Sequence, residues 1–136
     1  MDLNEVWSIM HPKIIELSKP RIESGQYADA VSAAFRQIEL SVRKTFVEKG
    51  GDGKEFGVDL MRKAFDIRDE KPILEFKSSS ECSDGSIQRG YEHMFEGSMM
   101  AIRNPKAHEN DDIALEDALR KLAFASMLMY KLDTVK

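Results

Sequence analysis

The sequence predicts an all-α fold, on the basis of helical spacing of apolar residues, few turn-forming residues and a length suited to one domain. The chain has 136 residues, of which only 8 are glycine and 4 are proline, and this composition argues against a turn-dense all-β protein. Hydrophobic residues make up 42% of the chain, which is enough for a core of ordinary size. We therefore expect one all-α domain over residues 1–136, with about five helices.

Composition also excludes several classes of protein. The single cysteine, Cys82, rules out an intrachain disulfide framework and a multi-cysteine zinc site. We find no run of roughly 18 apolar residues that could span a membrane and no secretory signal pattern at the start, so a cytoplasmic protein without a membrane partner is expected. The net charge of −4 gives no long-range attraction for nucleic acid, although it does not exclude a local basic site.

The N-terminal apolar pattern predicts a helix, or a pair of helices, over about residues 2–18. Pro12 interrupts the pattern, and Lys19-Pro20 is expected to end it because proline disfavours helix at the residue before it. The apolar residues at helical spacing are Val6, Ile9, Met10, Ile14 and Leu17.

The most regular helix follows Ser24-Gly25 and ends at the glycine-rich turn of residues 50–53. Its apolar residues form one stripe, which predicts a single buried face. The stripe comprises Tyr27, Ala30, Val31, Ala34, Phe35, Ile38, Val42 and Phe46.

Three further helices are expected, over about residues 57–66, 87–103 and 112–132. A short irregular apolar segment (71–76) and a polar loop (78–85) separate the first two of them.

Asp111 or Asp112 suits the N-cap of the last helix, because a carboxylate there accepts hydrogen bonds from free backbone N–H groups. Residues 122–130 of that helix carry no charge. Such a stretch is normally buried all round, so we expect it to lie centrally or to face a second copy of the chain.

The segment from Ile102 to Glu109 holds the residues best suited to chemistry. Pro105 should end the preceding helix near Arg103, while Asn104 is a good N-cap and Pro105 a good first residue for a new turn. His108 would then lie about one turn further on, so Arg103 and His108 could point into one space.

These residue types match the needs of metal-independent RNA cleavage. His108 could take a proton from a ribose 2′-hydroxyl or give one to the leaving oxygen. Arg103 could stabilise the charge on the phosphorane, and Asn104 could orient the phosphate. The products would be a 2′,3′-cyclic phosphate and a 5′-hydroxyl. In the structural alternative, Asn104 only caps a helix, Arg103 pairs with a carboxylate and His108 is a surface histidine.

The run Arg103-Asn104-Pro105-Lys106-Ala107-His108 resembles the R-x4-6-H motif of HEPN domains. Over about residues 10–132 the chain is also similar to the Ymh family, a branch related to HEPN domains. This similarity rests on an ordered set of short runs, namely residues 25–31, Ala34-Phe35, Glu39, residues 88–90, residues 95–97, residues 103–109 and Ala125-Ser126.

The resemblance implies an up-down helical bundle that often dimerises. In many members it acts as a metal-independent endoribonuclease in toxin, anti-phage or RNA-processing systems. The arginine–histidine segments of both protomers would meet in one composite cleft, so a homodimer is expected, with an antitoxin or regulatory protein as a further partner. Other members have lost catalysis and only bind RNA, nucleotides or protein, and this is the alternative function.

Glu39 is a further candidate at the edge of the apolar stripe. It could position Arg103 or His108, as an acidic residue does in several HEPN enzymes. Alternatively it could pair with Arg43, one helical turn along the same helix.

Arg89, His93 and Lys106 could add positive charge for RNA phosphates, although Arg89 and His93 could equally form an exposed polar face. His93, His108 and Cys82 lack metal-ligand spacing, so no metal and no cofactor are expected.

Overall fold

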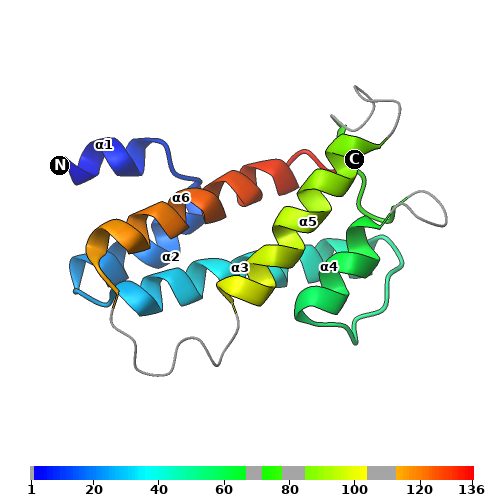
Figure 1. The fold of residues 1–136 in the computed structure, drawn as a ribbon, viewed down its shortest axis with the longest axis horizontal. Coiled ribbons are helices and arrows are strands. Elements are labelled where there is room, and N and C mark those ends of the chain that lie inside the picture. The colour runs from blue at the N-terminus through cyan, green and yellow to red at the C-terminus, as the bar shows by residue number, and fades with distance from the viewer. Residues whose placement is uncertain (1, 67–71, 78–84, 104–112) are drawn as a thin grey trace.

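The computed structural model describes residues 2–66, 72–77, 85–103 and 113–136, and these ranges hold six α-helices and one isolated β-bridge. The predicted all-α class is therefore confirmed, with one helix more than the five or so expected. The helices are α1 (Leu3–Ser8), α2 (Pro12–Glu23), α3 (Tyr27–Glu48), α4 (Gly57–Phe65), α5 (Ser86–Ala101) and α6 (Leu115–Leu132) (Figure 1).

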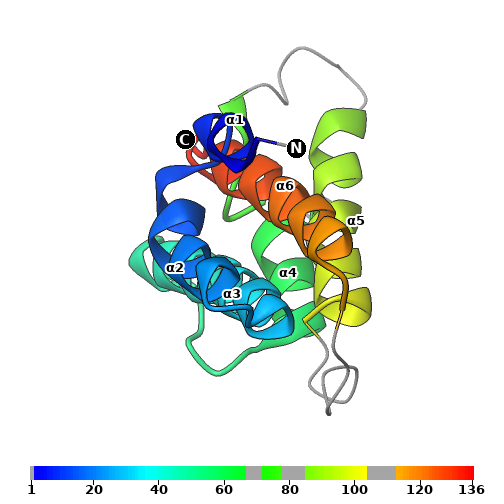
Figure 2. The same ribbon diagram turned by 90° about the vertical axis from the view of Figure 1, so that its left-hand side faces the viewer.

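Helix α3 is the centre of the bundle. It packs against α2, α4 and α6, while α5 packs mainly on α4. Figure 1 shows α3 and α6 along the long axis of the molecule and α5 crossing them, and Figure 2 shows α2 beside α3 on the side away from α5. Phe35 and Phe124 are neighbours, with ring centroids 6.2 Å apart, and the ends of α3 and α6 share one hollow. The two helices therefore run in the same direction.

The N-terminal pattern forms a pair of helices, which was one of the two expected arrangements. Asp2 caps α1 by accepting a hydrogen bond from the Asn4 amide at 2.9 Å. His11 caps α2, because its Nδ1 accepts from the Lys13 amide at 3.1 Å. Pro12 then occupies the first turn of α2, where its missing N–H removes no helical hydrogen bond.

Helix α2 continues past Pro20 to Glu23, so the predicted end at Lys19-Pro20 was wrong. A proline inside a helix removes one backbone hydrogen bond. Ile22 is only 4% exposed in the core, and the Ser18 hydroxyl donates to a carbonyl of α3 at 2.7 Å. Packing against α3 on both sides of Pro20 therefore outweighs the local preference of the proline.

The stripe predicted along α3 is confirmed as its buried face. Tyr27 at its start is half-buried, and the other stripe residues are all buried, namely Ala30, Val31, Ala34, Phe35, Ile38, Val42 and Phe46. The chain turns sharply after α3, where Gly50 has a φ of +96°. At Gly51 an added Cβ would lie 2.5 Å from the Phe46 ring, so the turn presses its backbone directly against the core.

The helices predicted over about 57–66 and 87–103 are α4 and α5, with ends within two residues of those expected. Between them, Leu74 and Phe76 are fully buried. Gln88 of α5 holds this segment in place. Its Oε1 accepts from the Phe76 amide at 3.1 Å, and its Nε2 donates to the carbonyls of Leu74 at 2.9 Å and Phe65 at 3.1 Å. The polar loop was predicted at 78–85, and Gly85 is the one residue of it that the structure describes.

Helix α6 begins at Leu115 with Ala114 as its N-cap, about one turn later than predicted. Asp111 and Asp112, the expected caps, lie outside the described residues. Most of the uncharged stretch of residues 122–130 lies in the core, which was one of its two expected positions. Its buried residues are Leu122, Ala125, Ser126, Leu128 and Met129.

Two large apolar residues of α6, Met127 and Tyr130, face outward. Met127 and Tyr130 are 43% and 48% exposed, and Ile9, which lines the same shallow hollow, is 71% exposed. Among the helices described, none combines the length and apolar character needed to cross a membrane.

Candidate functional site

Arg103 lies two residues past the last residue of α5, directly after its C-cap. Its amide donates to the Ser98 carbonyl at 2.9 Å, and Ile102 is the C-cap, so the predicted end of the helix near Arg103 is confirmed. The Arg103 side chain is 23% exposed, and its Nε makes no hydrogen bond within the described part of the chain. The guanidinium therefore lies at the edge of the core.

Glu39 of α3 lies beside this guanidinium. Its Oε1 is 3.7 Å from Arg103 Nε, which is an ion pair too long for a hydrogen bond. Its Oε2 accepts from the Gly57 amide at 2.7 Å, at the start of α4. One carboxylate thus joins the start of α4 to the residue that follows α5, and its side chain is only 14% exposed.

The two alternatives for Glu39 are thereby distinguished. Arg43, the other expected partner, donates instead from Nη2 to the Glu55 carbonyl at 3.3 Å. Its guanidinium carbon lies 3.7 Å from the centre of the Phe56 ring. The structure therefore brings Glu39 together with Arg103, while Arg43 turns towards the loop before α4.

Three of the predicted site residues, Asn104, Lys106 and His108, lie outside the described residues. The predicted convergence of Arg103 and His108 accordingly stays a prediction.

Arg89 and His93 line an open hollow of about 460 Å³ between α4 and α5. His93 Nδ1 is 3.9 Å from Glu96, and Arg62 Nε is bonded to Glu96 at 2.6 Å. With 1.5 Å of rise per residue, His93 lies about 15 Å from Arg103 along the helix axis, and Arg89 lies further still. Within one chain these two residues are therefore separate from the Arg103–Glu39 pair.

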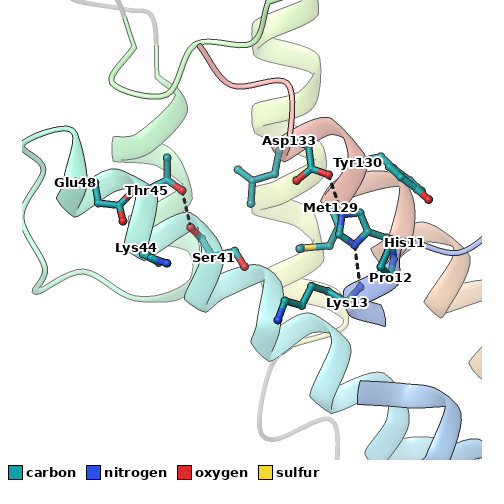
Figure 3. A pocket seen from close by; sticks show the side chains of 11 residues that line it. His11, Pro12, Lys13, Ser41, Lys44, Thr45, Glu48, Met129, Tyr130 and Asp133 are labelled. Atoms are coloured by element: carbon teal, nitrogen blue, oxygen red, sulfur yellow. Dashed lines mark hydrogen bonds and ion pairs between the residues drawn. The ribbon is translucent and has the colours of Figure 1, made fainter. Parts of the chain in front are cut away.

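A larger hollow, of about 660 Å³, lies between the start of α2 and the ends of α3 and α6 (Figure 3). In it, His11 Nε2 is bonded to the Asp133 carboxylate at 2.8 Å. Because Nδ1 accepts from the Lys13 amide, both ring nitrogens are already engaged. No motif in the sequence predicts this contact of His11, and the only signal is a polar residue directly before a proline at a helix start.

The Asp133–His11 pair of this hollow has the residue types of a catalytic dyad, but neither ring nitrogen of His11 is free to accept a substrate proton. A general base needs a free nitrogen within reach of a substrate proton, and His11 has none. The opposite wall, formed by Ser41, Thr45 and Lys44 of α3, faces the histidine across the opening (Figure 3). His11 therefore connects the start of α2 to α6 and its C-cap.

Comparison with known proteins agrees with the resemblance to the Ymh family. A family model described as "Protein of unknown function (Hypoth_ymh)" matches residues 8–132, which is nearly the whole chain. No curated protein and no solved structure matches the sequence significantly. The chain that carries the Glu39–Arg103 pair therefore belongs to the Hypoth_ymh family, whose function is not known.

Proposed function

We propose that this protein cleaves RNA without a metal ion, with Arg103 as the electrostatic stabiliser and His108 as the proton-transfer group. The observation that supports this most directly is the Glu39–Arg103 pair. It holds a permanent cation at the point where α5 ends, immediately before the segment that carries His108. The resemblance of that segment to the HEPN motif supplies the type of reaction.

In the proposed reaction, the ribose 2′-oxygen attacks the adjacent phosphorus while His108 removes the 2′-hydroxyl proton. The bond from phosphorus to the 5′-oxygen then breaks, and this oxygen receives a proton from a second acid. The Arg103 guanidinium neutralises charge on the non-bridging oxygens, with Asn104 and Lys106 as further phosphate contacts. The products are a 2′,3′-cyclic phosphate and a 5′-hydroxyl.

A second copy of the chain would supply the second acid, because each chain has a single histidine in the proposed motif. The exposed apolar side chains of Ile9, Met127 and Tyr130 offer a surface on which two copies could pack. We propose a homodimer with a composite site, acting in the cytoplasm as a toxin or anti-phage effector that an antitoxin or regulatory protein controls. Sedimentation velocity at micromolar concentration tests the dimer, and a monomeric sample would contradict the composite site.

The second candidate is a non-catalytic helical dimer that binds RNA or a partner protein. The same ion pair favours it in one respect, since the Glu39 carboxylate partly neutralises Arg103. A cation that is paired with an acid attracts a phosphate less strongly than a free one.

The decisive experiment is cleavage of a 5′-labelled single-stranded RNA in the presence of EDTA. We expect wild-type protein to release fragments ending in 2′,3′-cyclic phosphate, and His108→Ala and Arg103→Ala to reduce the rate at least about a hundredfold. Arg120→Ala, which removes an exposed arginine of α6, is the matched control and should keep full activity. Circular dichroism checks that all variants stay helical.

Two results would contradict the proposal. If wild-type protein binds RNA but never cleaves it, the non-catalytic candidate takes its place. Cleavage that persists in His108→Ala would assign the reaction to other residues.

A further inference from the structure

Phe56 is a large aromatic side chain on the surface, 61% exposed, directly before α4. It is the N-cap residue of that helix but makes no side-chain capping hydrogen bond. The Arg43 guanidinium covers one face of its ring, at 3.7 Å from the ring centre. Given the exposure of the residue, the opposite face of the ring is open to solvent.

The backbone next to this ring contacts the Arg103–Glu39 pair. Phe56 is covalently joined to Gly57, whose amide donates to Glu39 at 2.7 Å. Glu39 in turn lies 3.7 Å from Arg103 Nε, and Arg43, which covers the ring, lies one helical turn beyond Glu39 on α3. The aromatic residue and the cation of the proposed catalytic site are therefore linked through Glu39.

The guanidinium that covers the ring favours an anionic ligand. Glu55, the residue before Phe56, is bonded to Lys63 of α4, and this hydrogen bond, together with the nearby carboxylates of Asp52 and Asp59, raises the pKa of Lys63 above its ordinary value. Lys63 thus offsets the charge of Glu55, while Arg43 is the charged group that lies against the ring. Arg43 Nε, like Arg103 Nε, is buried without a hydrogen bond among the described residues.

We propose that Phe56, backed by Arg43, stacks on an unpaired RNA base next to the phosphate that Arg103 holds. This subsite rests on the proposed function for its RNA substrate. Aromatic side chains bind unpaired bases of single-stranded RNA by stacking, and a guanidinium beside the ring adds attraction for the backbone. The subsite would tolerate any base, because every base has a stacking face. The substrate is accordingly single-stranded RNA, or a loop, rather than a duplex.

The test measures binding apart from cleavage. A fluorescent single-stranded RNA with 2′-O-methyl groups throughout cannot form the cyclic phosphate, and its affinity is read by fluorescence anisotropy. Phe56→Ala should weaken binding about fivefold to a hundredfold, whereas Phe56→Trp should bind at least as well as wild type. Ile73→Ala, which shortens another exposed apolar side chain, 40% exposed, is the control and should leave the affinity unchanged.

A second ligand series identifies the base as the partner of the ring. Oligomers with one abasic position, moved stepwise along the chain, should bind wild type more weakly when the missing base is the stacked one. That loss should vanish in Phe56→Ala, because the base and the ring act as a pair. Thermal unfolding of each variant shows whether the fold has changed.

The outcomes separate this inference from the proposed function. Unchanged affinity of Phe56→Ala, or absence of RNA binding by wild type, overturns the subsite. If wild type cleaves RNA while Phe56→Ala binds normally, the cleavage proposal stands alone. If wild type never cleaves RNA but its binding depends on Phe56, the subsite stands as part of an RNA-binding surface.

Discussion

The imidazole of His11 and the carboxylate of Asp133 form a 2.8 Å hydrogen bond between the residue that precedes α2 and the residue that follows α6. The His11 amide donates to the Ser126 hydroxyl at 2.6 Å, and its ring meets Tyr130 edge-on with centroids 4.8 Å apart. The partners assign the ring proton to Nε2, since Nδ1 accepts from a backbone amide. One histidine thereby ties the start of α2 to the last helix.

We expect His11→Ala to lower the free energy of unfolding by about 1–3 kcal/mol, because it removes a helix cap and a hydrogen bond to a carboxylate. His11→Asn should lose less, since its shorter side chain can still cap α2 but cannot reach Asp133. Urea unfolding followed by circular dichroism measures both. Equal losses in the two variants would show that the cap contributes nothing.

Gln88→Leu should be among the most destabilising single changes in the described core. Leucine has a similar volume but removes the three hydrogen bonds that Gln88 makes, to the Phe76 amide and to the carbonyls of Leu74 and Phe65. Removing one partner of a buried hydrogen bond costs about 1–3 kcal/mol. The neighbouring exposed change Arg89→Ala should stay within about 0.5 kcal/mol of wild type. A loss below about 1 kcal/mol for Gln88→Leu would show that the 72–77 segment rearranges freely.

Gly51→Ala and Gly53→Ala should differ, although they lie in the same turn. An alanine Cβ at Gly51 would overlap the Phe46 ring at 2.5 Å, whereas at Gly53 the nearest atom is a methyl group of Val47 at 3.4 Å. We expect Gly51→Ala to lower the free energy of unfolding by about 1–3 kcal/mol and Gly53→Ala to change it little. Thermal unfolding compares the two, and equal midpoints would mean that Phe46 moves without cost.

Glu39→Gln tests whether the ion pair orients Arg103 for catalysis. The amide oxygen can still accept from the Gly57 amide, so stability should change by less than about 1 kcal/mol, in line with the small contribution of a loose pair. RNA cleavage should fall about tenfold to a hundredfold, because a misplaced catalytic group loses much of its effect. If the carboxylate instead only blocks Arg103, the variant will bind RNA more tightly than wild type does.

Local signals in the sequence were sufficient for much of the fold. The apolar stripe of α3 predicted its buried face, and the interruption at Pro12 allowed for a pair of helices at the N-terminus. Pro20 shows the limit of such signals, since a local preference against helix was overcome by packing that no local pattern reveals.

The candidate site shows the same limit. Arg43 and Arg103 were both reasonable partners for Glu39, and the spacing along α3 even favoured Arg43. What decides between them is where the loop before α4 and the end of α5 come to lie, and this depends on contacts far apart in the chain. Phe56 was missed because a single phenylalanine after a glycine-rich turn belongs to no helical or strand pattern.

The central position of α3 determines which backbone amides should exchange hydrogen most slowly. Ala34, Phe35 and Ile38 are fully buried, and three other helices cover the helix that carries them. Their amides should exchange hydrogen only through global unfolding, whereas α1, which is short and lies at one edge, should exchange by local fraying. Glu39 directly follows Ile38 on α3. The carboxylate that pairs with Arg103 should therefore stay in place until the whole molecule unfolds.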